Sequence, residues 1–207
     1  MRNKIKVILF DFGGVIAEEG FREGLMEIGR AHCLDPDAFC LTAETLIIET
    51  GDLIGHADEC TFWDAVRMKT GIIASDTVLR NVIIKRFKIR FEMIRYANRL
   101  RSKGLIVAML SDQTNWLDEI DRRSNLFQHF DRIFNSFHTH KNKLDATVFR
   151  DVCAEFNIRP AETLFIDDNI NHIKRAKGEG LNVIHFTGVR DFEKRITEFV
   201  TKVINKT

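Results

Sequence analysis

The 207-residue sequence lacks the features that mark several special classes of protein. No apolar run is as long as a membrane-spanning helix, and the first residues pass into an apolar stretch without a signal-peptide pattern. The net charge of +1, from 31 basic and 30 acidic residues, gives no electrostatic basis for binding nucleic acid or a membrane surface. We therefore expect a cytoplasmic protein, a monomer or homodimer, whose partner is a small molecule.

Cysteine and linker segments are also scarce. The chain has four cysteines, Cys33, Cys40, Cys60 and Cys153, with neither Cys-x-x-Cys pairing nor the spacing to histidine of a zinc finger. We expect all four to be reduced and structural. No internal repeat and no Pro-, Gly- or Ser-rich linker divides the chain. The length of 207 residues fits a single core, or one core with a smaller inserted domain, and the content of 44% hydrophobic residues is typical of a globular protein.

Residues 20–90 contain helical patterns and no convincing strand. Asp35-Pro36 predicts a helix start, and Gly51 and Gly71 predict helix ends. A further helix is expected over residues 75–87, with Val78, Leu79 and Ile83 on its apolar face. We expect residues 16–90 to form an inserted helical cap between two parts of an α/β core, residues 1–15 and 91–207.

The remaining pattern alternates strands with helices. Such alternation indicates a parallel sheet with helices on both faces, so we predict a doubly wound, Rossmann-like α/β fold. The expected strands cover residues 7–10, 105–110, 132–135, 163–166 and 182–186, and the expected helices of this part cover residues 92–102 and 146–157.

Asp11 lies where the first buried strand runs into a turn containing Gly13 and Gly14. Glycine allows the backbone to turn sharply and to approach a ligand closely. A carboxylate at the carboxyl end of a parallel strand is placed for chemistry, because ligands bind at this edge of an open α/β sheet. A solvated acid in a turn is the simpler reading of this stretch taken alone.

Polar groups follow two other predicted strands, at Ser111 and at Asp167-Asp168. The carboxyl ends of parallel strands meet at one edge, so these groups should converge with Asp11. Clustered carboxylates repel one another, and a divalent cation with oxygen ligands offsets the repulsion, with Mg²⁺ the natural choice. A cation beside a carboxylate, a hydroxyl and a lysine suits phosphoryl transfer.

Four segments in this order resemble the motifs of the haloacid dehalogenase superfamily over essentially the whole chain. They are residues 10–15, residues 110–115, the region from Ser136 to Phe149, and residues 165–169. The resemblance implies that Asp11 is the nucleophile, that Lys143 rather than Lys141 is the catalytic lysine, and that Ser111 and Asp112 bind phosphate. It implies Mg²⁺ bound by Asp11, the Gly13 carbonyl, Asp167 and Asp168.

Within the superfamily, residues 49–51 and Phe62-Trp63 look like the helical cap of a branch that includes glucose-1-phosphatase-type enzymes. The resemblance thus implies a Mg²⁺-dependent phosphatase that acts on a small phosphorylated metabolite through an aspartyl-phosphate intermediate. Phe62, Trp63 and Trp116 could line the substrate pocket, but aromatic residues at helical spacing more often belong to a core. Asp112 should cap the following helix or offer its backbone N–H to phosphate.

The chief departure from the family is Gly13, where most phosphatases of the superfamily carry a second Asp as general acid and base. General acid–base help is typically worth about 10²- to 10⁴-fold. One alternative is therefore a regulatory protein that binds phosphate and Mg²⁺ but barely turns over; a metal-free dehalogenase ranks behind it. A further hypothesis is that His140 or His172 replaces the missing group, since both loops should reach the active edge.

Overall fold

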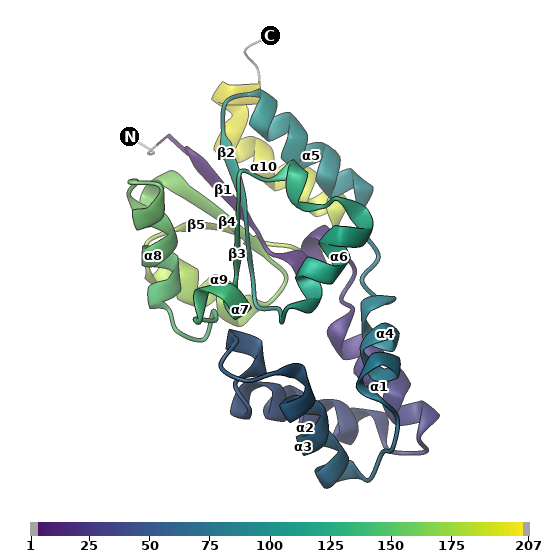
Figure 1. The fold of residues 1–207 in the computed structure, drawn as a ribbon. Helices are drawn as coiled ribbons and strands as arrows, with labels where there is room; N and C mark the ends of the chain where they lie inside the picture. Colours follow the sequence, from purple (N-terminus) through teal and green to yellow (C-terminus); the bar gives the residue numbers. More distant parts are fainter. Residues whose placement is uncertain (1–3, 205–207) are drawn as a thin grey trace.

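In the computed structural model, which describes residues 4–204, five parallel strands form one sheet in the order β3-β2-β1-β4-β5 (Figure 1). The expected α/β part also includes residues 1–3 and 205–207, which lie outside the described residues. Strand β1 is central and pairs with β2 and β4. The predicted doubly wound α/β fold is confirmed. The strands are β1 (Val7–Phe10), β2 (Ile106–Ser111), β3 (Arg132–Asn135), β4 (Thr163–Asp167) and β5 (Asn182–His185).

Two hydrophobic clusters cover the two faces of the sheet. Ile8 and Phe10 of β1 belong to the first cluster, and Val7 and Leu9 belong to the second, as the period of two along a strand requires. The helices of the first face are α5 (Phe91–Ser102), α6 (Trp116–Ser124) and α10 (Val189–Ile204); those of the second are α8 (Thr147–Glu155) and α9 (Ile170–Gly178).

The chain between β1 and α5 is helical, as expected, and lies beyond the carboxyl edge of the sheet (Figure 1). Asp35 accepts a hydrogen bond from the Ala38 N–H at 2.8 Å and caps the second helix, and Gly71, at φ +78°, ends the third. The elements of this segment are α1 (Phe21–Ala31), α2 (Pro36–Glu49), the short 3₁₀ turn η2 (Asp52–Ile54), α3 (Glu59–Thr70) and α4 (Asp76–Ile84).

Two antiparallel connections join this helical segment to the sheet. The Glu18 N–H donates to Lys88 O, and the Arg90 N–H donates to Ile16 O, each at 2.8 Å. The Arg90 guanidinium also donates to Ala17 O at 2.6 Å. The expected boundaries after residues 15 and 90 fall at this pair of connections. The first hydrophobic cluster runs without a break from the sheet into the helical segment.

Several expected details are corrected. The helix expected over 75–87 ends at Ile84, and Val78 is 55% exposed, because α4 buries a narrow stripe formed by Leu79 and Ile83. Strand β2 extends to Ser111. The sequence reading did not delimit α1, α6, α9 or α10. Cys33 and Cys60 are free but exposed, whereas Cys40 and Cys153 are free and buried.

Among the described residues, no helix combines the length and the apolar character needed to span a bilayer.

Candidate active site

Asp11 occupies the first position after β1 and is 7% exposed. Its backbone N–H donates to Ile166 O at 2.9 Å, which continues the pairing with β4 beyond the end of the strand. Its carboxylate Oδ1 accepts the Phe12 N–H at 2.7 Å. The sheet and the following turn therefore fix both the backbone and the side chain of Asp11.

The two glycines after Asp11 have different roles. Gly14 has φ +77°, and a Cβ built there would lie 2.0 Å from Oδ2 of Asp168. Only glycine allows this close approach. Gly13, at φ −65° and ψ 136°, has a backbone conformation that any residue can adopt. The expectation that both glycines serve the turn is therefore correct only for Gly14.

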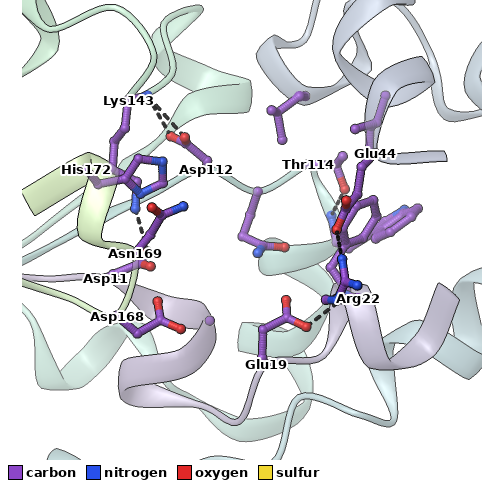
Figure 2. Close-up of a pocket in the computed structure, with 16 residues that line it drawn as sticks. Asp11, Glu19, Arg22, Glu44, Asp112, Thr114, Lys143, Asp168, Asn169 and His172 are labelled. Carbon is purple, nitrogen blue, oxygen red and sulfur yellow. Dashed lines mark hydrogen bonds and ion pairs between the residues drawn. The ribbon is translucent and has the colours of Figure 1, made fainter. Parts of the chain in front are cut away.

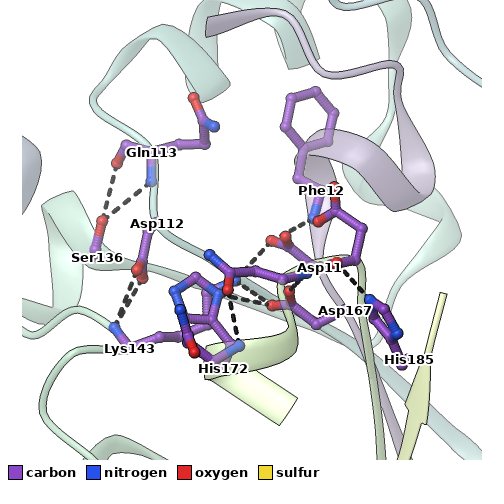
Figure 3. Close-up of polar contacts among 12 residues, drawn as sticks. Asp11, Phe12, Asp112, Gln113, Ser136, Lys143, Asp167, His172 and His185 are labelled. Carbon is purple, nitrogen blue, oxygen red and sulfur yellow. Dashed lines mark hydrogen bonds and ion pairs between the residues drawn. The ribbon is translucent and has the colours of Figure 1, made fainter. Parts of the chain in front are cut away.

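Lys143 lies at the centre of the site and is 1% exposed. Its Nζ is 2.9 Å from Oδ1 of Asp11 and 2.8 Å from Oδ2 of Asp167 (Figure 3). Burial disfavours the charged amine, but the neighbouring carboxylates hold the pKa of Lys143 above its usual range. Lys141, in contrast, is on the exposed side of the loop and pairs with Asp151.

Asp112 fixes the loop that carries Lys143. Its two carboxylate oxygens accept the Lys143 N–H at 3.0 and 3.1 Å (Figure 3). The expectation that Asp112 caps the next helix is wrong, because α6 begins after Asn115 and has no side-chain cap. The carboxylate is taken up by the Lys143 loop instead.

Asp167 and Asp168 differ although they are adjacent. Asp167 is fully buried, and despite that burial Lys143 and His172 hold its pKa below the usual range. It also accepts the Asn169 N–H at 2.7 Å and faces His172 Nδ1 at 3.1 Å. Asp168 lines the cavity, and burial together with Asp167 raises its pKa.

Carboxylate oxygens of Asp11, Asp167 and Asp168 lie within 4.8 Å of one another. Burial raises the pKa of Asp11, with Asp167 and Asp168 adding to the effect and Lys143 opposing it. One lysine thus faces three crowded carboxylates. A divalent cation with oxygen ligands would offset the remaining repulsion, so these residues fit such an ion.

A cavity of about 260 Å³ opens above this group. Figure 2 shows one wall formed by the sheet edge and the opposite wall formed by the helical segment. The α/β part contributes Asp11, Gly13, Asp112, Gln113, Thr114, Trp116, Lys143, Asp168, Asn169 and His172 to the lining, and Thr114 among them lies on the side of Glu44 and Arg22 in Figure 2. The helical wall comprises Glu19, Phe21, Arg22, Glu44, Ile47 and Leu53.

Not every expected residue reaches the cavity. Ser111 is 1% exposed, is absent from the lining, and its Oγ has no hydrogen-bond partner within the described chain. Phe62 and Trp63 are fully buried core residues. Trp116 is 1% exposed, stacks on Trp63 at a centroid distance of 6.0 Å, and also contributes to the lining.

The two candidate histidines lie in different places. His172 lines the cavity beside Asp167. His140 does not line it: its Nδ1–H donates to Ile54 O at 2.8 Å. It has φ 56°, a left-handed conformation that favours glycine over other residues. The expectation that both histidine loops reach the active edge is wrong for His140.

Hydrogen bonds to η2 connect the helical segment to the α/β part beside the cavity. Ser136 Oγ donates to Leu53 O at 2.8 Å and accepts the Gln113 N–H at 3.1 Å (Figure 3 shows the latter contact). With the bond from His140 to Ile54, these contacts join η2 to α7 (Ser136–Thr139) and the loop after it. One serine thus positions both walls of the cavity.

Sequence reasoning missed most of the helical wall. Glu19, Arg22 and Glu44 belong to no motif, and their place depends on how α1 and α2 lie over the sheet edge. Gln113 and Thr114 stand inside the second motif, so their nearness to Ser111 was a usable signal.

Comparison with known proteins agrees with this geometry. A family model described as haloacid dehalogenase-like hydrolase matches residues 5–180. The bifunctional epoxide hydrolase 2 of Sus scrofa is 28% identical over 118 residues, which cover 52% of this chain and 21% of that protein. The match therefore spans about a fifth of the length of the curated relative.

Solved structures of similar fold include a HAD family enzyme from Bacteroides thetaiotaomicron, with a TM-score of 0.76, 21% identity, and coverage of 94% of this chain and 99% of that one. The same enzyme in complex with magnesium and inorganic phosphate has a TM-score of 0.68 and 22% identity, with coverage of 87% of this chain and 93% of that one. The L-2-haloacid dehalogenase of Xanthobacter autotrophicus has a TM-score of 0.66 and 18% identity, with coverage of 97% of this chain and 84% of that one. At these identities the likeness concerns the fold.

Proposed function

The chain belongs to the haloacid dehalogenase-like hydrolase family, and from this premise we propose that it is a Mg²⁺-dependent phosphatase of small phosphorylated metabolites. The observation that carries the proposal is the group at the floor of the cavity. There a carboxylate, Asp11, lies 2.9 Å from a buried lysine and within reach of two further carboxylates. The Bacteroides relative whose structure contains magnesium and inorganic phosphate supports the same chemistry.

In the proposed reaction, Asp11 attacks phosphorus and forms an aspartyl phosphate, which water then hydrolyses. Lys143 favours the ionised form of Asp11 against the effect of burial, and it would neutralise charge on the phosphoryl oxygens. Ser111, whose Oγ lacks a partner, and the backbone N–H of Asp112 would donate to the phosphate.

Asp11, the Gly13 carbonyl and Asp168 would hold Mg²⁺ directly. Asp167 supports them, because its own oxygens already contact Lys143, His172 and the Asn169 N–H. Bound Mg²⁺ would stabilise the charge on the transferring phosphoryl group.

Residues 16–90 would act as a cap that supplies substrate selectivity, in the manner of the glucose-1-phosphatase-type branch. The helical wall of the cavity supports this role, because it brings Glu19, Arg22 and Glu44 opposite the sheet edge (Figure 2). A sugar phosphate or a similar polyhydroxy compound could use the charged groups of this wall, which also presents the apolar side chains Phe21, Ile47 and Leu53. We expect a cytoplasmic monomer or homodimer.

The test is a phosphate-release screen against phosphorylated sugars and nucleotides, with and without Mg²⁺. We expect turnover that requires Mg²⁺ and that falls at least about 10³-fold in Asp11→Asn, because the nucleophile is removed. Circular dichroism of Asp11→Asn checks that its fold is intact. Near wild-type turnover by this variant would refute the mechanism.

Two other outcomes identify the alternatives. Binding of Mg²⁺ and phosphate without turnover of any compound would favour a regulatory protein, an alternative raised by Gly13. Halide release from a 2-haloacid in the absence of metal would favour a dehalogenase. The crowding of three carboxylates around one lysine weighs against metal-free chemistry.

A further inference from the structure

The proposed reaction lacks a proton donor for its leaving group. An alkoxide is a poor leaving group, so breaking the bond between phosphorus and an alcohol oxygen needs a proton from a nearby acid. Gly13 contributes no side chain. A Cβ built at this position would lie 3.5 Å from Phe87 Cε1 and 3.7 Å from Gln113 Nε2, and neither group is an acid.

Most other titratable groups of the sheet wall are already engaged. Asp112 accepts the Lys143 N–H through both oxygens. The Lys143 amine contacts Asp11 and Asp167. His172 uses Nδ1 to contact Asp167, on the side of the site away from the helical wall (Figure 2). Asp168 belongs to the group of three carboxylates proposed to hold Mg²⁺. The helical wall offers two further carboxyl groups, Glu19 and Glu44.

Glu19 is the acid of the helical wall that is best placed. It lies just before α1, and its Oε2 accepts the N–H groups of Arg22 at 2.9 Å and Glu23 at 3.4 Å. The start of the helix thus holds one oxygen, and neither bond uses Oε1. Figure 2 shows the carboxyl between Asp168 and Arg22, facing the cavity.

The ring of Phe87 links Gly13 to the segment that carries Glu19. It lies beside the position of a Cβ on Gly13, and also beside Gly20, where a Cβ would be 2.4 Å from Phe87 Cγ. Glu19 immediately precedes Gly20. Glu19 and Gly13 both line the cavity, and Gly13 contributes no side chain to it.

The electrostatics agree with this geometry. Burial raises the pKa of Glu19 above its usual value, and Asp168 adds to the increase, while the backbone donors at the start of α1 oppose it. A carboxyl group with a raised pKa is better able to hold a proton near neutral pH and to give it up during catalysis.

We infer that Glu19 is the general acid and base of the proposed phosphatase. As Asp11 attacks phosphorus, the bond from phosphorus to the alcohol oxygen breaks and that oxygen takes the proton of Glu19. The Glu19 carboxylate then takes a proton from water as the water oxygen attacks the aspartyl phosphate. The bond between phosphorus and Asp11 breaks, inorganic phosphate leaves, and both side chains return to their starting states. This role rests on the proposed function.

The test compares Glu19→Gln with wild type on two substrates: an alkyl phosphate found by the screen, and p-nitrophenyl phosphate, whose leaving group needs no proton. We expect kcat for the alkyl phosphate to fall about 10²- to 10³-fold. With p-nitrophenyl phosphate, we expect a stoichiometric burst of p-nitrophenol followed by slow turnover, because only hydrolysis of the aspartyl phosphate is impaired. Intact-mass spectrometry should show the accumulated phosphoryl group.

Two variants serve as controls. Glu18→Gln changes an exposed neighbour outside the cavity lining and should retain wild-type kinetics. Gly13→Asp in the Glu19→Gln background should restore part of the alkyl phosphatase activity, because the backbone at position 13 accepts a side chain. If Glu19→Gln does not fold, Glu19→Asp keeps the acid and tests the role through the same two substrates.

The outcomes separate the two proposals. An equal loss on both substrates without a burst, or no loss at all, would overturn the role of Glu19 and leave the phosphatase assignment standing. A wild-type protein that releases no phosphate from any compound would overturn both.

Discussion

The sheet edge and the helical segment treat a buried carboxylate in opposite ways. At the sheet edge, Asp167 is fully buried but contacts Lys143 at 2.8 Å, and its pKa is held below the usual range. In the helical segment, Asp52 of η2 is also fully buried, yet neither of its oxygens has a hydrogen-bond partner in the described part of the chain. Burial, with Glu59 and Asp58 adding to it, raises the pKa of Asp52 to about 7.

The difference shows where charge is kept. At the sheet edge the buried cation Lys143 holds the pKa of Asp167 below its usual range despite burial, and it opposes the rise in pKa that burial causes at Asp11. Asp52 has no such cation, so its neutral form is favoured below about pH 7. The surroundings of Asp167 thus stabilise its ionised form, whereas those of Asp52 favour its protonated form.

Removing the positive charge of Lys143 should destabilise the folded protein. Lys143→Met leaves Asp11 and Asp167 buried without their partner, and loss of one member of a buried charge group typically costs about 3–5 kcal/mol. We expect urea unfolding to show a loss of this size in the free energy of unfolding at neutral pH.

Lys141→Met is the matched control two residues away. Lys141 pairs with Asp151 on the surface, where solvent screens the two charges, so we expect a much smaller loss than in Lys143→Met. Similar losses in the two variants would mean that the contacts of Lys143 are no more important than those of a surface lysine.

The same comparison shows what the sequence could reveal. Asp11 and Asp167-Asp168 were predictable, because buried strands have a recognisable pattern and parallel strands end at one edge. Choosing Lys143 over Lys141 required the family resemblance, since both stand in one polar loop. The hydrogen bond from the Lys143 N–H to the Asp112 carboxylate was not predictable, because it depends on the path of that loop.

The helical wall was beyond sequence reasoning for a different reason. Its helices could be predicted from caps and apolar spacing, but Glu19 and Glu44 face the cavity only because of the way α1 and α2 cross the sheet edge. Asp52 gave no signal either, because an acid after Gly51 reads as an ordinary exposed turn residue.

The free energy of unfolding measured over a range of pH should reveal the raised pKa of Asp52. Its pKa is near 4 in the unfolded chain and about 7 in the fold, so between these values the folded state binds the proton that the unfolded state has lost. This group therefore lowers the free energy of unfolding as pH rises from 4 to 7, and its effect is constant above pH 7.

Asp52→Asn cannot ionise and should escape this loss. We expect its stability relative to wild type to increase with pH by up to about 1.4 kcal/mol per pH unit within that window. Denaturant unfolding at pH 4.5, 6 and 8 measures the difference, with Asp37→Asn, an exposed acid of α2, as control. A difference that does not change with pH would show that Asp52 is ionised throughout.

The smallest effect is expected at the exposed end of the helical wall, where Glu44 lies 3.3 Å from Arg22. Their side chains are 35% and 48% exposed, so Glu44→Gln should change the free energy of unfolding by less than about 0.5 kcal/mol. If this wall selects substrate without taking part in proton transfer, KM for the best substrate should change several-fold while kcat stays the same. Steady-state kinetics of Glu44→Gln beside Glu19→Gln measures both constants. A fall in kcat alone for Glu44→Gln would place proton transfer, and not only selectivity, at this end of the cavity.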